Sequence, residues 1–284
     1  MKKYILLVWE CAYPILIHFG ISLFLGVAYI FVGTFLEVFK QQGNMDIQAV
    51  TNQVMENYMN HSLYIMAVSS CITIPLLYLF FRLDKKKLPS LPKVENKPME
   101  WIVLVVVAAT VCISLNSLIT YSGISEIFDG FNEVAEYLYA GGIVVEILVV
   151  GILVPVSEEL LFRGLIFQRL ALYTKPATAI VVSALIFGIY HGNVVQGIYA
   201  FCIGAIMAMC YWKFQNLLAP ICMHMVANIV SVCITEIEVV GNIFENQVVG
   251  IVATIITTVL WILGLIFLMK KQGIHSENGQ LQAG

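Results

Sequence analysis

Long runs of apolar residues constrain this chain more than any other feature of its sequence. A helix needs about 20 mostly apolar residues to cross the hydrocarbon core of a bilayer. Eight segments qualify or nearly qualify, at 11–39, 62–81, 101–120, 143–172, 177–190, 194–214, 217–234 and 248–269. We therefore expect an all-α, polytopic membrane protein, built as a bundle of about eight transmembrane helices.

The composition agrees with a chain that is surrounded by lipid. Hydrophobic residues make up 60% of the sequence and charged residues only 12%, whereas an average soluble domain carries about 25% charged residues. The formal net charge of −3 gives no basic excess that would favour a nucleic acid. The expected partner is the lipid bilayer. The seven cysteines lie in apolar stretches without a CxxC pair, which is typical of packed small side chains.

The charged loops predict how the bundle is oriented. With eight spans, nearly all Lys and Arg residues outside the apolar runs fall on one side, and Lys40 is the exception. The other side carries acids, such as Asp46, Glu56 and Glu236. Because positive loops stay in the cytoplasm, we expect a multi-pass protein of the cell membrane with both termini cytoplasmic. An odd number of spans would scatter the basic residues.

Polar residues inside the apolar runs are costly, so each invites a functional explanation. The fourth run contains Glu158, Glu159 and Arg163, and Glu159 and Arg163 lie four residues apart, where a helix lets them pair. Glu158 points about 100° away from Glu159. Pro155 precedes this group and is expected to free a carbonyl and bend the helix. The alternative is that the three charges form a salt-bridge cluster at the cytoplasmic interface.

Two histidines and an asparagine follow in later spans. His191 ends the fifth run, and His224 and Asn228 lie four apart in the seventh. At 1.5 Å per residue, Glu158 and His191 lie about 20 Å from the cytoplasmic ends of their helices, and His224 about 12 Å. A lone histidine in a helix is more often a packed core residue. A carboxylate, two imidazoles and an amide at comparable depths can instead converge on one site.

Such a set of groups is suited to hydrolysis. A carboxylate removed from water holds a proton more tightly, which suits a general base near neutral pH. One imidazole can share the activation of water, while the other and the amide can donate hydrogen bonds to an oxyanion. The sequence has no Ser-His-Asp arrangement, nucleophile elbow or HExxH motif, so serine and zincin-type peptidases lack support.

Three motifs in series resemble those of one family. Glu158-Glu159-x-x-x-Arg163, Phe187-x-x-x-His191 and His224-x-x-x-Asn228 are similar to the motifs of the CAAX protease and bacteriocin-processing family of membrane endopeptidases. The resemblance covers about residues 149–230. It implies an eight-helix bundle with a cavity open to the cytoplasm.

The resemblance also implies a role for each motif residue. Glu158 and His191 would activate water, and His224 and Asn228 would stabilise the oxyanion. Glu159 and Arg163 would shape the site through their pairing, and Phe187 would line it.

Metal use is left open by the sequence. Glu158, His191 and His224 could form a zinc triad. Asn228 is a poor fourth ligand, and an oxyanion role uses it better, so we favour a mechanism without a cofactor.

We expect one membrane domain with three regions. Residues 1–142 hold N-terminal spans, a basic cytoplasmic linker at 82–97 and an amphipathic outer interfacial helix at 125–139. Residues 143–235 form the catalytic core, and 236–284 contain the last span and a cytoplasmic tail. We expect the small-residue stripe Ala200, Gly204 and Ala208 to allow close helix packing. His18 is expected to be packed or snorkelling rather than catalytic.

The sequence therefore predicts an intramembrane endopeptidase that cleaves a membrane-associated peptide or a lipidated protein. The short, lysine-rich chain without eukaryotic-looking loops suggests a bacterial member, in which prenyl substrates are not expected. Peptide processing, bacteriocin self-immunity or maturation of a signalling peptide are the favoured uses. The alternative is a non-enzymatic membrane protein for self-immunity or partner binding. A transporter would show inverted repeats, and we find none.

Overall fold

A computed structural model describes residues 2–40, 46–87, 94–128, 138–139 and 141–270 of the chain. Within these residues the secondary structure is helical, and no strand is present. The helices are α1 (Lys2–Lys40), α2 (Ile47–Lys87), α3 (Pro98–Ser122), α4 (Ile124–Ile127), α6 (Ile143–Leu148), η1 (Val149–Leu153), α7 (Val154–Glu159), η2 (Leu160–Phe167), α8 (Gln168–Tyr173), α9 (Pro176–Tyr190), α10 (Val194–Phe214), α11 (Leu218–Glu236), α12 (Glu238–Glu245) and α13 (Gln247–Lys270).

The expected all-α, polytopic membrane fold is confirmed. Six helices in the described part of the chain are long and apolar enough to cross a membrane: α1, α2, α3, α10, α11 and α13. The shorter apolar helix α9 is a seventh element. The eighth runs without a break from α6 to α8, over 143–173, and we call it the compound helix. Each element overlaps one predicted span.

The compound helix departs from a regular α-helix at two places. The segments η1 and η2 are π-helical, so their backbone hydrogen bonds skip one more residue than usual. At the end of η1, the N–H of Val154 donates to Val149 O, five residues back. Pro155 follows immediately and has no N–H to donate. The bend that Pro155 predicts is thus accompanied by a wider helical turn, which the sequence pattern does not reveal.

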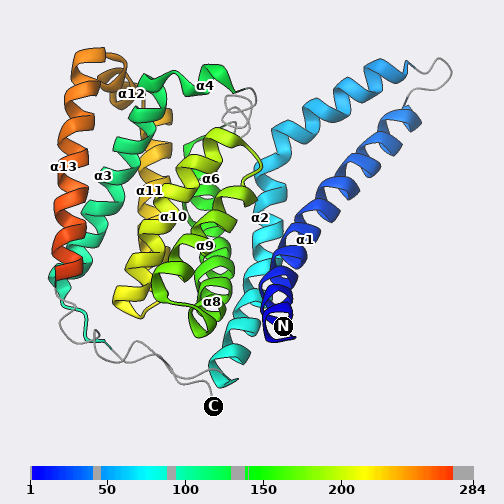
Figure 1. Cartoon of the computed structure of the whole chain (residues 1–284). Helices are drawn as coiled ribbons and strands as arrows, with labels where there is room; N and C mark the ends of the chain where they lie inside the picture. The colour runs from blue at the N-terminus through cyan, green and yellow to red at the C-terminus, as the bar shows by residue number, and fades with distance from the viewer. Residues whose placement is uncertain (1, 41–45, 88–93, 129–137, 140, 271–284) are drawn as a thin grey trace.

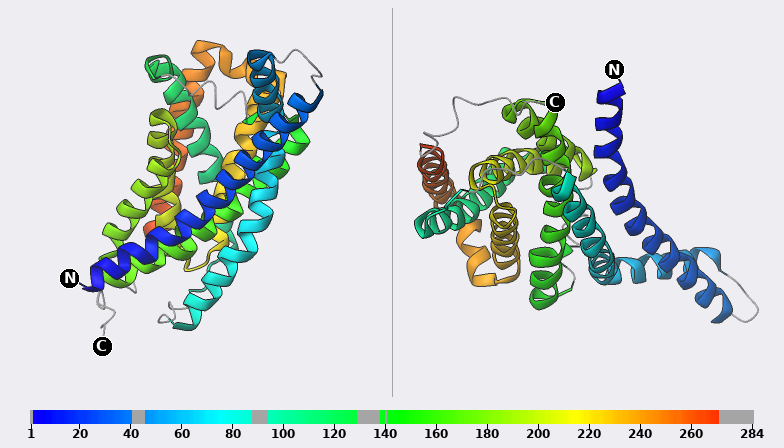
Figure 2. Two further views of the ribbon diagram at one scale, coloured as in Figure 1. Left: turned by 90° about the vertical axis from the view of Figure 1, so that its right-hand side faces the viewer. Right: turned by 90° about the horizontal axis from the view of Figure 1, so that it is seen from below.

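The helices form a bundle with one pair at its side (Figure 1). Helix α3 packs against α13 and α11, and α9 packs against α10. Helix α1 lies on the outside of the bundle beside α2 (Figure 2), and the ends of α1 and α2 that face each other across residues 41–45 lean away from the other helices. The start of α1 and the end of α13 lie on the same side of the molecule. We call this side the terminal side.

The apolar core centres on the compound helix. Leu161, Phe162, Leu165 and Ile166 are fully buried there and pack with residues from α3, α10 and α11. In contrast, α1 and α13 expose many large apolar side chains, as expected for helices that face acyl chains.

Three expected features fall wholly or partly outside the described residues. The interfacial helix at 125–139 is described only at its ends, where α4 covers Ile124–Ile127. The linker at 82–97 is described except for 88–93, and its first part continues α2 to Lys87. The tail from residue 271 lies outside the description.

Candidate active site

An ion-pair cluster in the bundle interior links the compound helix to α11. Arg163 Nη1 donates to Glu159 Oε1 at 2.7 Å, as their i,i+4 spacing predicts. His224 Nδ1 lies 2.9 Å from the same oxygen. Arg163 and Glu159 are fully buried, so each charge depends on its partner, because an unpaired buried charge is strongly destabilising. The cluster therefore fixes His224 relative to the compound helix.

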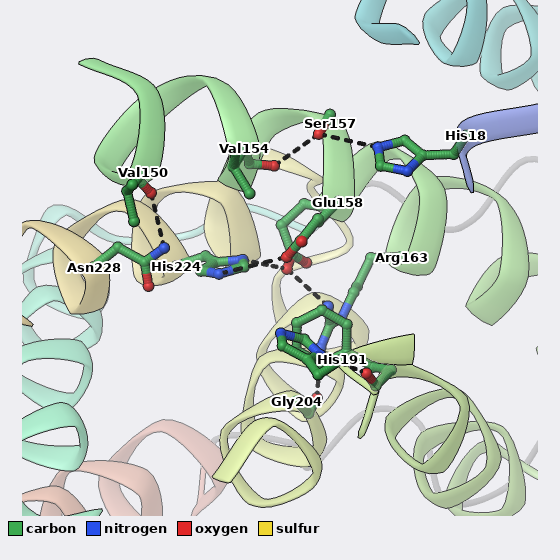
Figure 3. A network of polar contacts seen from close by, with 12 residues as sticks. His18, Val150, Val154, Ser157, Glu158, Arg163, His191, Gly204, His224 and Asn228 are labelled. Atoms are coloured by element: carbon green, nitrogen blue, oxygen red, sulfur yellow. Dashed lines mark hydrogen bonds and ion pairs between the residues drawn. The ribbon is translucent and has the colours of Figure 1, made fainter. Parts of the chain in front are cut away.

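Glu158 lies beside this cluster and faces another way. Its Oε2 is 3.8 Å from Nε2 of His224, so His224 is flanked by Glu159 at one ring nitrogen and by Glu158 at the other. Glu158 is buried except for 9% of its surface, and it lines a cavity. Figure 3 shows Glu158, His224 and Arg163 converging from the compound helix and α11. The predicted rotation of Glu158 away from Glu159 thus gives the two carboxylates different surroundings.

His191 follows the last residue of α9, and its ring orientation is set locally. Nδ1 lies 2.8 Å from Phe187 O. A carbonyl oxygen can only accept a hydrogen bond, so Nδ1 must carry the hydrogen, and in the neutral ring Nε2 is then the basic nitrogen. His191 lines the same cavity as Glu158. Its geometry leaves Nε2 able to accept a proton.

Asn228 is held by the irregular turn of the compound helix. Its Nδ2 donates to Val150 O at 2.8 Å. In a regular α-helix the N–H of Val154 would take that carbonyl, but here it bonds to Val149 O instead. The π-turn therefore frees the acceptor that positions the amide of Asn228. The amide has a second N–H, and Asn228 also lines the cavity.

Phe187 and Gly204 complete the surroundings of Arg163. The ring of Phe187 lies under the guanidinium, with Arg163 Cζ 4.6 Å from the ring centroid. Arg163 Nη2 donates to Gly204 O at 2.9 Å. A Cβ on Gly204 would lie only 2.8 Å from Phe187 Cδ1 and 3.2 Å from Arg163 Nη2. Gly204 therefore permits the close approach of α10 that supplies this carbonyl.

All four residues assigned to catalysis from the sequence line one cavity of about 560 Å³. The supporting residue Phe187 lines it too, whereas Glu159 and Arg163 lie behind its wall. Further lining comes from the late part of α3 (Asn116, Ile119), the start of α10 (Gln196, Tyr199) and the late part of α11 (Ser231). Because α3 and α11 run away from the terminal side and α10 runs back toward it, the cavity lies in the opposite half of the bundle.

This position bears on the expected cavity opening. The resemblance implied a cavity open to the cytoplasm, and the positions of the basic loops predict that the terminal side is cytoplasmic. A cavity in the half of the bundle away from that side does not fit both expectations together. The depths of about 20 Å expected for Glu158 and His191 agree with this position, because they exceed half of a hydrocarbon core that is about 30 Å thick. The depth of about 12 Å expected for His224 does not.

Sequence reasoning missed the contribution of α2 to the cavity. One face of this helix points into it, and this face consists of Met55, Tyr58, Met59, Ser62, Ile65, Met66 and Ser69. The spacing of three and four residues was present in the sequence. This spacing is also typical of a face that packs against another helix, however, and nothing in the pattern shows that the face borders a cavity instead. We call this set of residues the α2 face.

The residues that could hold zinc do not form a ligand cluster. Within the described part of the chain, no three His, Cys, Asp or Glu side chains are grouped as a metal ion requires. Glu158 and His224 approach each other, but the third expected ligand, His191, does not complete a group with them.

Fold and site together define a helical membrane protein with a carboxylate, two imidazoles and an amide around a cavity inside its bundle. Comparison with known families adds that residues 140–230 match the family described as "Type II CAAX prenyl endopeptidase Rce1-like". This segment contains all seven predicted site residues. This part of the chain is therefore similar to the Rce1-like family.

The chain is also similar to a curated protein. The chain is 33% identical over 101 residues to the Bacillus subtilis (strain 168) protein named "Putative membrane peptidase YdiL". The alignment covers 36% of this chain and 41% of that protein, so the chain matches less than half of the relative's length. No solved structure matches the chain.

Proposed function

We propose that this protein is a membrane-embedded endopeptidase that hydrolyses a peptide bond of a membrane-associated peptide or protein. One observation carries the proposal: Glu158, His191, His224 and Asn228 line a single cavity within an apolar bundle. Carboxylate, imidazole and amide groups around one cavity are the parts that hydrolysis needs. The match of residues 140–230 to a family of endopeptidases supports the same chemistry.

Glu158 and His191 are proposed to activate the water. The carboxylate of Glu158 and the basic Nε2 of His191 can each accept a proton from a water molecule between them, and the resulting hydroxide attacks the substrate carbonyl. The hydrogen bond from His191 Nδ1 to Phe187 O holds the ring in the required tautomer. The proton then passes to the departing amine.

His224 and Asn228 are proposed to stabilise the oxyanion of the tetrahedral intermediate. Asn228 offers its amide N–H while Val150 O anchors the side chain. His224 must carry hydrogen on both ring nitrogens to donate from Nε2, because Nδ1 is engaged by Glu159. The carboxylates of Glu158 and Glu159 lie 3.8 Å and 2.9 Å from its two ring nitrogens. We propose that these groups suffice without a metal, and metal analysis of the active purified protein tests this.

The α2 face is proposed to bind the apolar part of the substrate. Its methionines, Met55, Met59 and Met66, lie in the same cavity as the catalytic groups. Methionine side chains are flexible and polarisable and adapt to varied apolar partners. Among the described residues that line the cavity, Glu158 is the one with a formal charge apart from the histidines. The substrate segment that enters is therefore proposed to be uncharged and apolar.

The proposal is tested by comparing the peptides of membranes that contain wild-type protein or the Glu158→Ala or His191→Ala variant. Peptides released by the wild type should be absent from both variants, at equal protein level in the membrane. Glu238→Gln, at an exposed carboxylate outside the site, should release them normally. Cleavage at the wild-type rate by either active-site variant would refute the mechanism.

A second measurement separates hydrolysis from binding. Glu158→Gln keeps the shape of the side chain but removes the base. If the cellular function of the protein depends on hydrolysis, this variant should not complement a deletion strain. Full complementation would instead favour a non-enzymatic protein, such as a self-immunity or partner-binding protein.

A further inference from the structure

His18 is a buried polar residue of α1 that the mechanism above does not use. The buried side chains of α1 include Leu7, Cys11, Pro14 and His18, spaced by three or four residues. This spacing places them on one helix face, which turns toward the bundle. His18 therefore occupies a position where an apolar residue would satisfy packing alone, and a polar ring there needs hydrogen-bond partners.

The ring finds a partner on each of two other helices. His18 Nδ1 lies 2.6 Å from the hydroxyl of Tyr190 at the end of α9, and Nε2 lies 3.4 Å from Ser157 Oγ in α7. The rings of His18 and Tyr190 also meet edge to face, with centroids 5.8 Å apart. Figure 3 shows His18 reaching from α1 toward Ser157.

These contacts have a consistent hydrogen-bond direction. Ser157 Oγ donates to Val154 O at 2.9 Å, so toward His18 it must accept, and Nε2 carries the hydrogen. In the neutral ring Nδ1 is then the acceptor, and the Tyr190 hydroxyl donates to it. The chain of bonds runs from Tyr190 through His18 and Ser157 to Val154, and every donor in it has an acceptor.

Each of the two partners of His18 is adjacent in sequence to one of the two residues that are proposed to activate the water. Ser157 precedes Glu158, and Tyr190 precedes His191. Tyr190 is further held by the ring of Phe162 at 5.4 Å, and Phe162 contacts Phe187. The bonds to His18 therefore tie the backbone beside Glu158 to the backbone beside His191.

We propose that His18 is a positioning residue that sets the separation between Glu158 and His191, which makes α1 part of the active-site architecture. This inference rests on the proposed peptidase function. It concerns geometry: His18 does not touch substrate, but it holds the two helix segments that present the water-activating groups. Helix α1 lies outside the segment that matches the family, and His18 is otherwise interpreted as a packed residue.

The inference is tested by measuring kcat and KM for a substrate found in the peptide comparison. His18→Ala and Tyr190→Phe should each lower kcat about ten- to hundredfold, as expected when reacting groups are misplaced by a fraction of an ångström, and leave KM nearly unchanged. Tyr190→Phe keeps the aromatic ring and removes only the hydroxyl, so it should fold normally. His18→Gln offers both a donor and an acceptor and should recover part of the rate.

The double variant decides between positioning and packing. If both residues act through one hydrogen-bonded link, His18→Ala combined with Tyr190→Phe should lower kcat no further than the more damaging single change. Additive losses, or a wild-type kcat in Tyr190→Phe, would overturn the inference. His61→Ala, at an exposed histidine of α2 that bonds to Tyr29, is the matched control and should keep the wild-type kcat. Failure of the peptidase proposal is recognised separately, because Glu158→Ala would then cleave like the wild type.

Discussion

Gly204 shows how a single residue without chemistry of its own can support the site. Its carbonyl accepts a hydrogen bond from Arg163, and its missing side chain leaves room for the Phe187 ring. Arg163 bonds to Glu159, and Glu159 in turn contacts His224. A shift of α10 at Gly204 would therefore displace His224 in the proposed oxyanion site.

Gly204→Ala is therefore expected to be costly. The new Cβ would lie 2.8 Å from Phe187 Cδ1, and such overpacking typically destabilises a protein by about 1–3 kcal/mol. The apparent melting temperature in detergent should fall together with the cleavage rate. Gly20→Ala in α1, where a Cβ meets nothing within 4 Å, is the control. An unchanged melting temperature for Gly204→Ala would contradict the packing described.

For individual residues, the sequence predicts contacts within one helix well and contacts between distant helices poorly. The Glu159–Arg163 pair follows from a spacing of four residues in a helix and is confirmed. That His224 shares the same carboxylate oxygen depends on how α11 packs against the compound helix. His18 illustrates the limit more clearly, since its partners are 139 and 172 residues away and no local pattern connects them.

In the compound helix, the irregular backbone next to Pro155 positions a side chain of the site, and this link can be tested. Pro155 withholds an N–H next to η1, and Val150 O is left for Asn228. Pro155→Ala supplies the missing donor and should allow the turn to relax toward regular α-helical bonding. Val150 O would then be taken by the backbone, and Asn228 would lose its anchor.

We expect Pro155→Ala to lower kcat at least tenfold with little change in KM, because it disturbs an oxyanion donor rather than the substrate contacts. The melting temperature should stay the same or rise, since the helix gains a hydrogen bond. A variant with wild-type kcat would show that the proline does not maintain the turn.

The proposed substrate binding at the α2 face can be tested by filling part of the cavity. Met59→Trp places a larger side chain in the cavity and should lower kcat/KM for an apolar substrate about tenfold or more, by an amount typical of altered hydrophobic pockets. Ile72→Trp changes an exposed position outside the cavity lining and should leave kcat/KM unchanged. Equal values for both variants would argue against substrate binding at the α2 face.

For the whole molecule, orientation and access can be tested together. The basic loops predict a cytoplasmic terminal side, and the cavity lies in the other half of the bundle. In intact cells, a membrane-impermeant maleimide should therefore label Met55→Cys above the background of the parent chain. Lys86→Cys, at an exposed position in the last turn of α2, lies on the terminal side and should be labelled only after the membrane is permeabilised. The reverse pattern would place the termini outside and the cavity toward the cytoplasm.

Local patterns in the sequence were sufficient to identify lipid as the main surroundings of this chain, to predict about eight helices and to single out its unusual polar residues. These properties follow from local physics: apolar runs of fixed length satisfy their own backbone in lipid, and a buried charge is conspicuous wherever it occurs. The packing of the helices in three dimensions was needed to show that the α2 face borders the site, that a π-turn positions Asn228, and that His18 joins α1 to two other helices. Each of these depends on the rotation and depth of one helix against another, and a periodic pattern leaves both undetermined.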